Sequence, residues 1–265
     1  MSVPATLVKE LRDQTGAGMM DAKRALEEAG GDLDAAKRLL RERGMARAAS
    51  RAGRQTTQGT ILTAVSGQVG TMVAVGCETE PVSNNDEFVG FAERVLENVI
   101  ERGPDATAEL ETERNELIAR LGENVEIRGA VRLKAQDGEE IGEYVHPSVT
   151  NKIGVLVRVR GDNPADARRL AMHISFAAPR FVTRDDVSEE ALAEEREIYT
   201  AQPDVQSKPE QVREKIVDGM LQKRFYAEAV LADQAWIHEP SLTVGKALEQ
   251  AGLEVVEFRR FALAG

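Results

Sequence analysis

Residues 70–88 read GTMVAVGCETEPVSNNDEF, and the pattern changes from strand to helix within them. The first eight residues, Gly70 to Cys77, are mostly apolar and rich in valine, as in a buried strand. Between the two patterns lies CETEPVSNND, in which acids, a proline and two asparagines interrupt both. The stretch therefore predicts a strand, a stiff acidic turn and an amphipathic helix that packs on the strand. The apolar face of that helix is formed by Phe88, Phe91, Ala92, Val95 and Val99.

Working outward, the flanking sequence predicts two small antiparallel sheets, each backed by helices. The strand just described completes a hairpin over 60–77 that turns at SGQ, and a second helix follows at about 106–121. Strands return in VEIRGAVRLKA, IGEYV and IGVLVRVRG, and a helix over 163–178 covers the last of them. We therefore expect an α+β fold, with one core subdomain over 60–140 and another over 141–265.

The N-terminal residues 1–44 carry three short apolar stripes at helical spacing, separated by glycine-containing turns. They predict a compact three-helix domain whose last helix ends at Gly44, and residues 45–59 predict a helical extension that becomes a linker. The first turn, TGAG, is a candidate phosphate-binding loop. No apolar strand precedes it and no Gly-Lys-Ser/Thr follows, so we interpret it as a tight interhelical turn.

The second N-terminal helix carries two adjacent methionines. Met19 falls at the spacing of Ala22 and Leu26, which places it on the buried face. Met20 lies about 100° further round the helix and is expected to be partly exposed. An exposed, adaptable methionine suits partner recognition, and gap-filling at the edge of a small core is the alternative.

Residues 186–226 differ in kind from the core. Pro203 and Pro209 forbid one continuous helix, so the segment predicts two antiparallel helices that project as a hairpin. Such a hairpin can use a broad apolar face for self-association or for packing back onto the sheet, and the sequence leaves both open. That face is formed by Val212, Ile216, Val217, Met220, Leu221 and Phe225.

Charge and hydropathy exclude several classes of function. The 265 residues carry a net charge of -11, which argues against a protein that grips nucleic acid or an anionic membrane through a general positive field. No window approaches the roughly 20 apolar residues of a membrane span. The N-terminus lacks the pattern of a signal peptide. We therefore expect a cytoplasmic protein with no membrane contact and no direct nucleic-acid contact.

Side chains suited to covalent chemistry are few. Cys77 is the only cysteine, which excludes an internal disulfide and a cysteine-based zinc site. His146, His173 and His238 are far apart, and no motif for metal binding or nucleophilic catalysis occurs. We therefore expect no enzymatic catalysis, no metal and no cofactor. Cys77 and Trp236 are interpreted as packing residues, and His173 is interpreted as a hydrogen-bonded residue of the core or of an interface rather than a metal ligand.

Several segments together resemble the elongation factor Ts family of bacteria. The most specific is VKELRDQTGAGMMD, and the core adds HPSVTNKIGVLVRVRG, LAMHISFAAPRF, SKPEQVREKIVDGMLQKRF and EPSLTVGKALEQAGLEVVEFRRF. The resemblance implies an N-terminal ubiquitin-associated-like domain, two α+β subdomains and a coiled-coil hairpin often used for dimerisation. It also implies a guanine nucleotide exchange factor for elongation factor Tu. Because the sequence ends at Gly265, we expect it to lack the further C-terminal helical module of some members.

The resemblance implies which residues contact elongation factor Tu. Arg12, Met19 and Met20 match positions that contact its nucleotide-binding domain. His146 lies in a segment that touches its third domain. A further set matches a loop that disturbs the bound magnesium ion and promotes GDP release, and its members are Thr79, Glu80, Pro81 and Val82.

This sequence departs from the family pattern at the centre of that loop. Glu80 stands where an aspartate is usual, and Pro81 stands where an aromatic wedge is usual. Pro81 fixes its own φ and biases Glu80 toward extended geometry, so the loop is expected to be stiff. Phe88 is an alternative wedge, but its helical spacing with Phe91 favours a place in the core.

Two other functions compete with this interpretation. An RNA-associated module is motivated by Arg47, Arg51 and Arg54, and by Arg158 and Arg160, although the acidic balance of the chain speaks against it. An adaptor that presents peptides through its N-terminal domain alone is the second. Deleting the N-terminal domain distinguishes the adaptor from the exchange factor. An adaptor would lose all function, whereas an exchange factor would retain part of its activity.

Overall fold

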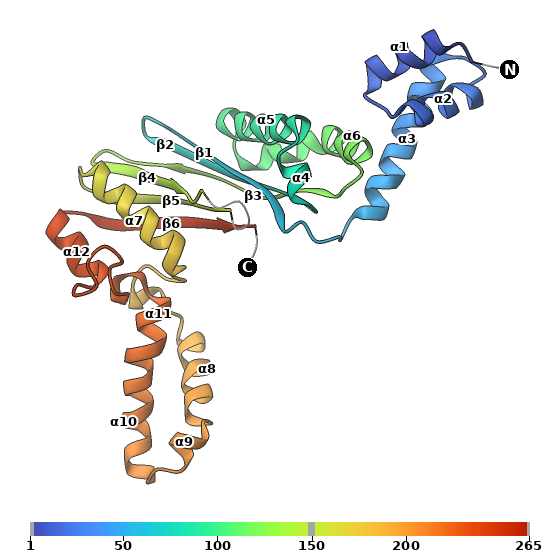
Figure 1. The fold of residues 1–265 in the computed structure, drawn as a ribbon. Coiled ribbons are helices and arrows are strands. Elements are labelled where there is room, and N and C mark those ends of the chain that lie inside the picture. The colour runs from blue at the N-terminus through green and yellow to red at the C-terminus, as the bar shows by residue number, and fades with distance from the viewer. Residues whose placement is uncertain (1–2, 148–151, 264–265) are drawn as a thin grey trace.

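The computed structural model describes residues 3–147 and 152–263, and it is a mixture of helices and antiparallel sheet, which confirms the α+β class (Figure 1). The strands are β1 Gln58–Ser66, β2 Val69–Cys77, β3 Val125–Lys134, β4 Glu139–Val145, β5 Ile153–Arg160 and β6 Glu254–Ala262. The longer helices are α1 Ala5–Thr15, α2 Met19–Glu28, α3 Leu33–Arg51, α5 Asp86–Arg102, α6 Glu111–Leu121, α7 Pro164–Ala177, α8 Glu189–Thr200, α10 Glu210–Met220 and α12 Val244–Ala251. Short helices are α4 Glu80–Ser83, α9 Pro203–Gln206 and α11 Ala227–Ala229. The first two residues of the predicted N-terminal domain and the last two of the second core subdomain lie outside the described residues. The domain boundaries stay predictions.

The strands form two three-stranded antiparallel sheets that stack on each other. Their orders are β1-β2-β3 and β4-β5-β6. Alternate residues of β2 explain the stacking, because Val73 and Val75 face the α5 and α6 side while Met72 faces the other sheet. In β5, Val157 packs under α7 and Leu156 faces the first sheet. Both central strands are therefore buried on two faces, which accounts for their nearly continuous apolar sequence.

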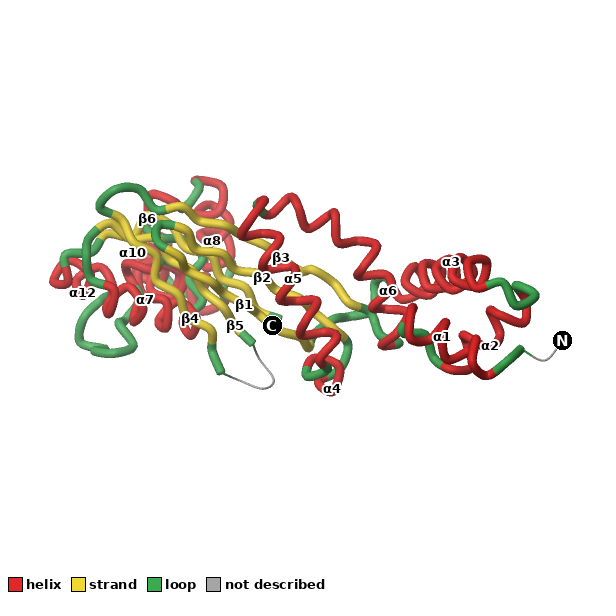
Figure 2. The backbone as a smooth tube through the Cα atoms, turned by 90° about the horizontal axis from the view of Figure 1, so that it is seen from above, coloured by secondary structure: helices red, strands yellow, loops and turns green. Residues whose placement is uncertain are grey.

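The third N-terminal helix does not end at Gly44, and this prediction is wrong. The helix α3 continues to Arg51, with Gly44 buried inside it. A Cβ at Gly44 would lie 3.2 Å from the Cβ of Ala119 in α6, so the glycine permits a close helix crossing. Ala48, one turn further on, belongs to the core beneath the first sheet. The predicted helical extension at the start of residues 45–59 is thus present as the last part of α3, which lies beside α6, as Figure 2 shows from above.

The placement of Met19 is also corrected by the structure. Met19 is 59% exposed and Met20 is 60% exposed, so only the prediction for Met20 is confirmed. Met19 is the first residue of α2, and the buried positions begin at Ala22. A residue at the start of a helix can follow the apolar spacing and still lie beyond the packed turn.

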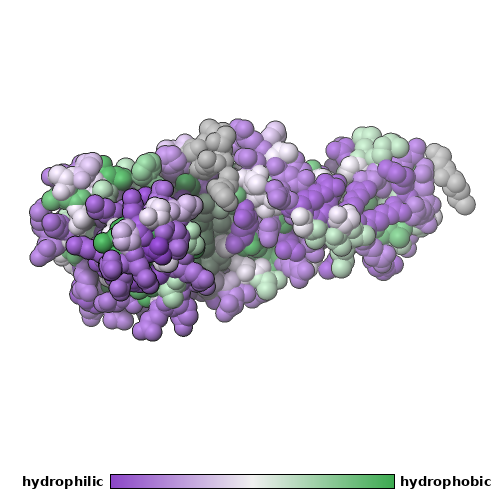
Figure 3. All heavy atoms as spheres, turned by 90° about the horizontal axis from the view of Figure 1, so that it is seen from below, coloured by the Kyte–Doolittle hydropathy of each residue, from purple (hydrophilic) through white to green (hydrophobic). Residues whose placement is uncertain are grey.

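The segment 186–226 forms the predicted projecting hairpin (Figure 1). Pro203 begins the short α9 and Pro209 precedes α10, as expected for residues that cannot continue a helix. Most of the broad apolar face packs inside the hairpin rather than onto the sheets, and Val212 is exposed. Figure 3 views this part from below and shows a largely hydrophilic surface. The buried members of this hairpin core are Tyr199, Val205, Val217, Leu221, Phe225 and Ala229.

Candidate functional site

The base of the loop after β2 is fixed by the turn between α6 and β3. The backbone amide and the hydroxyl of Thr79 both donate to the carboxylate of Glu123, at 3.0 and 2.6 Å. One residue earlier, the carboxylate of Glu78 accepts from the backbone amide of Asn124 at 2.7 Å. Two consecutive loop residues are therefore held by two consecutive turn residues.

The tip of this loop is a single helical turn, α4, and this corrects the expected geometry of Glu80. The extended residue is Thr79, with φ -128° and ψ 155°, and Glu80 is already helical. Pro81 fits the first turn of a helix, because the amide it lacks would have no partner there. The carbonyl of Glu80 accepts from the Ser83 hydroxyl at 2.7 Å and from the Asn84 side chain at 3.1 Å. These hydrogen bonds hold the backbone of the turn, and the stiffness of the loop stays a prediction.

The exposed part of the loop is small and polar. Thr79, Glu80 and Pro81 are exposed, and Val82 is half-buried against the core under the first sheet. Phe88 is fully buried, which confirms its place in the core and removes it as an alternative wedge. The loop therefore presents a carboxylate and a proline ring on a fixed backbone.

Cys77 is a buried packing residue and His173 is a hydrogen-bonded core residue, as predicted. Burial raises the pKa of the Cys77 thiol to about 12, and the thiol donates to the carbonyl of Thr79 at 3.3 Å. The Nε2 atom of His173 lies 2.9 Å from the Oε1 atom of Gln234, and burial lowers the pKa of this imidazole. Trp236 is buried beside His173, with ring centroids 5.2 Å apart. Both groups belong to the interior of the fold.

The three N-terminal residues singled out by the resemblance all lie on the surface. Arg12 is in the last turn of α1, and Met19 and Met20 open α2. The TGAG turn joins these helices with Gly16 at φ 66°, and a Cβ there would lie 2.5 Å from the Cδ of Arg120. TGAG is thus a tight interhelical turn, as predicted. Its close approach to Arg120 of α6 was not predicted.

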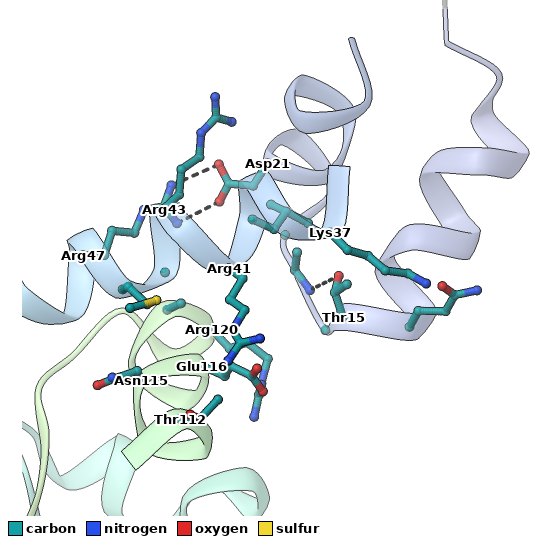
Figure 4. Close-up of a pocket in the computed structure, with 18 of the residues that line it drawn as sticks. Thr15, Asp21, Lys37, Arg41, Arg43, Arg47, Thr112, Asn115, Glu116 and Arg120 are labelled. Atoms are coloured by element: carbon teal, nitrogen blue, oxygen red, sulfur yellow. Dashed lines mark hydrogen bonds and ion pairs between the residues drawn. The ribbon is translucent and has the colours of Figure 1, made fainter. Parts of the chain in front are cut away.

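A cleft of about 580 Å³ separates the N-terminal helices from α6 (Figure 4). Its wall is braced by the guanidinium of Arg47, which donates to both carboxylate oxygens of Asp21 at 3.1 and 3.2 Å. Arg120 lines the cleft and donates through Nε to Glu87 at 2.5 Å. Because Glu87 lies in the first turn of α5, just after the loop, Arg120 connects the TGAG turn to the segment that carries the loop.

The last predicted contact residue, His146, is exposed at the end of β4. Its Nδ1 atom lies 3.1 Å from the hydroxyl of Tyr144. Figures 1 and 2 both place the end of β4 on the same side of the molecule as α4. The predicted residues therefore fall into three separate groups: the loop, the N-terminal surface and the end of β4.

Sequence reasoning did not single out Glu123, Asn124 or Arg120. These residues lie 33 or more positions from the groups they hold, and no spacing pattern marks such pairs. Within residues 3–147 and 152–263, no group of three or more His, Cys, Asp or Glu side chains is placed to hold a metal ion. None of the helices in those ranges is long and apolar enough to cross a membrane.

The exposed loop and the exposed methionine pair are surfaces that another macromolecule can contact. A family model described as elongation factor TS matches residues 78–265. Elongation factor Ts of Idiomarina loihiensis is 39% identical over 98% of this chain and 91% of its own length. The Methylococcus capsulatus and Thioalkalivibrio sulfidiphilus proteins of the same name are 39% and 40% identical, each over 98% of this chain and 92% of their own length. The chain therefore belongs to the elongation factor Ts family, a family of translation elongation factors.

Proposed function

We propose that this protein is a guanine nucleotide exchange factor for elongation factor Tu, acting in the cytoplasm by protein binding and without covalent catalysis. The observation that carries the proposal is the loop Thr79–Val82, whose base is held by the Glu123 carboxylate and whose tip is the hydrogen-bonded turn α4. A loop that is already ordered loses little entropy when it docks. It is therefore suited to enter a narrow site on a partner.

The mechanism follows from the electrostatics of a bound nucleotide. A magnesium ion bridges and neutralises phosphate oxygens in a nucleotide-binding site. A loop that presses beside this ion and brings the Glu80 carboxylate near it disturbs the ligands of the metal and leaves the diphosphate poorly compensated. The effect is reciprocal, because a factor that weakens nucleotide binding is itself bound less tightly when nucleotide is present. The factor therefore holds the empty partner until GTP enters.

The other exposed residues supply anchoring contacts in this proposal. Arg12, Met19 and Met20 of the ubiquitin-associated-like N-terminal domain contact the nucleotide-binding domain of elongation factor Tu. His146 contacts its third domain. The flexible thioether side chains of methionine adapt to an apolar partner surface, and both methionines are more than half exposed.

The contacts of the arginines disfavour the RNA-binding alternative. Arg47 pairs with Asp21, Arg54 with Glu78 and Arg160 with Glu254. Cations already paired with carboxylates release fewer counterions on meeting phosphate. The adaptor alternative is disfavoured by α3, because a helix that packs on α6 ties the N-terminal domain to the core.

The proposal is tested by the release rate of labelled GDP from elongation factor Tu. The wild-type protein is expected to accelerate release. Glu80→Ala combined with Pro81→Ala is expected to lower the stimulated rate roughly tenfold or more, which corresponds to about 1.4 kcal/mol of lost barrier reduction. Glu101→Ala, at an exposed site on α5, is the matched control and is expected to change nothing.

Two outcomes contradict different parts of the proposal. If wild-type protein leaves the release rate unaltered, the exchange function is wrong. If wild-type protein accelerates release and the loop variant does so equally well, the function stands and the role of Glu80 and Pro81 is wrong.

A further inference from the structure

The end of α6 and the turn after it contact both parts of the molecule that carry predicted partner surfaces. Ala119 meets Gly44 of α3, where a Cβ would lie 3.2 Å from the Cβ of Ala119. Glu123, in the turn, accepts both hydrogen bonds from Thr79 at the base of the loop. Arg120 lies between these two contacts in the chain and lines the cleft shown in Figure 4. This short segment is therefore placed to set where the N-terminal domain lies relative to the loop.

The side chain of Arg120 makes two different contacts along its length. Its methylene stem packs on Gly16, where a Cβ would lie 2.5 Å from the Cδ atom and 3.7 Å from the Cγ atom of Arg120. Its guanidinium donates through Nε to the carboxylate of Glu87 at 2.5 Å. The Arg120 side chain is 22% exposed and that of Glu87 is 52% exposed. Because a half-exposed ion pair contributes little by itself, the packed stem is an essential part of what Arg120 contributes.

Gly16 lies at the base of the predicted N-terminal contact surface. Its backbone amide donates to the carbonyl of Arg12 at 2.7 Å, and its φ of 66° ends α1 in the left-handed conformation. Gly18 then precedes α2, which opens with Met19 and Met20. A side chain that packs on Gly16 therefore touches the turn from which both predicted contact helices extend.

Glu87 belongs to the segment that carries the loop. Its backbone amide donates to the side chain of Asn85 at 2.8 Å, which caps the start of α5. The backbone amide of Asn85 donates in turn to the carbonyl of Val82, the last residue of the loop, at 3.0 Å. Arg120 therefore joins the turn at Gly16 to the loop through a short chain of contacts.

The contact at Gly16 adds to what the helix crossing at Gly44 provides. The ends of α1 and α2 face α6 across a cleft of about 580 Å³. A domain attached through one small contact remains able to rotate about it, and a second contact on a different element opposes that rotation. Two surfaces held at a fixed separation engage one partner with a high effective concentration and lose less entropy on docking.

We propose that Arg120 is a positioning residue for nucleotide exchange, because it holds the N-terminal contact surface at a fixed distance and orientation from the loop. One molecule of elongation factor Tu then meets both surfaces at once. The inference rests on the proposed function for its partner, while the placement itself is a property of the free protein. Removing the Arg120 side chain is expected to weaken joint binding and to leave the action of a docked loop unchanged, since Glu123 still holds the base of the loop.

The placement is tested in the free protein by the distance between two spin labels. Lys9→Cys on α1 and Glu101→Cys on α5 supply exposed attachment sites, and Cys77 is buried and does not compete for the label. We expect one narrow distance distribution in the labelled protein and a broader one after Arg120→Ala. Arg120→Met keeps the stem without the charge and is expected to fall between the two. Equal widths in all three proteins would overturn the inference, whether or not exchange occurs.

A matched pair of glycines separates the Arg120 contact from backbone strain. Gly16→Ala and Gly30→Ala each place a side chain on a left-handed backbone, with φ 66° and 63°. A Cβ at Gly16 meets Arg120, whereas a Cβ at Gly30 meets no atom of the described residues within 4 Å. We therefore expect both variants to lower the melting temperature and Gly16→Ala alone to broaden the distance distribution. The same broadening in both would contradict the role of the Arg120 contact.

GDP release at increasing concentrations of this protein tests the consequence for exchange. Arg120→Ala is expected to raise the half-maximal concentration about fivefold and to keep the maximal rate within about twofold of wild type. Arg120→Lys, which keeps the stem and the charge, is expected to restore most of the loss. A lower maximal rate at an unchanged half-maximal concentration would overturn the positioning role. Should the wild-type protein itself fail to accelerate release, the proposed function is wrong and with it the exchange role of Arg120, while the label distances still show whether Arg120 fixes the domain.

Discussion

Two helical units extend from the stacked sheets (Figure 1), and they differ in how much of their apolar surface they leave exposed. The N-terminal domain leaves Met19, Met20 and Met45 more than half exposed. The hairpin closes most of its apolar face on itself, with Val217 and Phe225 inside. A stripe of apolar residues therefore indicates that a helix has an apolar face. Which other element of the protein packs on that face depends on the tertiary fold.

The same two units also differ in how they join the core. Helix α3 crosses α6 closely at Gly44 and enters the core at Ala48, so the N-terminal surface is held relative to the loop. Both units have a hydrophobic core of their own, but of the two only the N-terminal helices place a buried residue, Ala48, in the described core beneath the first sheet. We expect changes inside the hairpin to stay local and changes at the α3 crossing to reach the exchange function.

The largest expected effect is that of Phe225→Ala in the hairpin core. Phe225 is buried against Phe181 and Tyr226, and deleting a buried phenylalanine side chain costs roughly 3–5 kcal/mol. Hydrogen exchange is expected to show lost protection in α8 and α10, while stimulated GDP release is retained. Equal loss of protection in α1–α3 would contradict the separation of the two units.

Substitutions at two helical glycines give the next test, because they are expected to change the stability of the protein in opposite directions. Gly44→Leu forces α3 away from Ala119 and is expected to destabilise the protein by roughly 2 kcal/mol through overpacking and to slow stimulated GDP release. Gly219→Ala in α10 meets no atom within 4 Å and is expected to stabilise by about 0.5–1 kcal/mol through helix propensity. Chemical denaturation measures both. The comparison fails if the two substitutions shift stability in the same direction.

Exposed apolar residues of the two units are compared by double substitution. Met19→Ala with Met20→Ala is expected to weaken binding to elongation factor Tu about tenfold, and to change stability by less than about 0.5 kcal/mol because both side chains are exposed. Ile198→Ala with Val212→Ala on the hairpin is the matched control. Titration of the partner distinguishes the two, and equal losses would show that exposure alone decides affinity.

The smallest expected effect concerns the ion pair between α2 and α3. The hydrogen bonds from Arg47 hold the pKa of Asp21 below its ordinary value of 3.8. A carboxyl whose pKa is lowered by folding stabilises the folded state above its unfolded pKa and loses that contribution as pH falls through the folded value. Asp21→Asn is therefore expected to cost about 0.5 kcal/mol near pH 7. The difference from wild type should shrink below pH 3.8, and a difference that grows on acidification would contradict the assignment.

Much of the fold follows from local patterns. The strand at Gly70–Cys77, the helix from Phe88 and the breaks at Pro203 and Pro209 all appear where the sequence indicates them. Local patterns failed at Gly44 and Met19, for one shared reason. Each lies where a helix meets or leaves a neighbouring element, and the spacing of a single helix contains no information about that neighbour.

The sequence predicted where the loop lies, but it did not predict the conformation of the loop. The acids and proline after Cys77 indicate a stiff turn, but Glu80 is helical because Ser83 and Asn84 cap its carbonyl. The clamp by Glu123 joins residues 44 positions apart. Contacts between side chains this far apart in the chain produce no periodic pattern in the sequence. The sequence therefore indicated the contribution of Pro81 to a stiff loop and not that of Glu123.

The sequence alone determined the α+β class, the family resemblance and the position of the turn after β2, because periodicity and motif are properties of neighbouring residues. The tertiary structure decided which methionines reach solvent, how α3 carries the N-terminal domain on α6, and that the Glu123 carboxylate holds Thr79 at the base of the loop. These depend on contacts between elements that lie far apart in the chain, where packing and hydrogen bonding act after the local elements have formed.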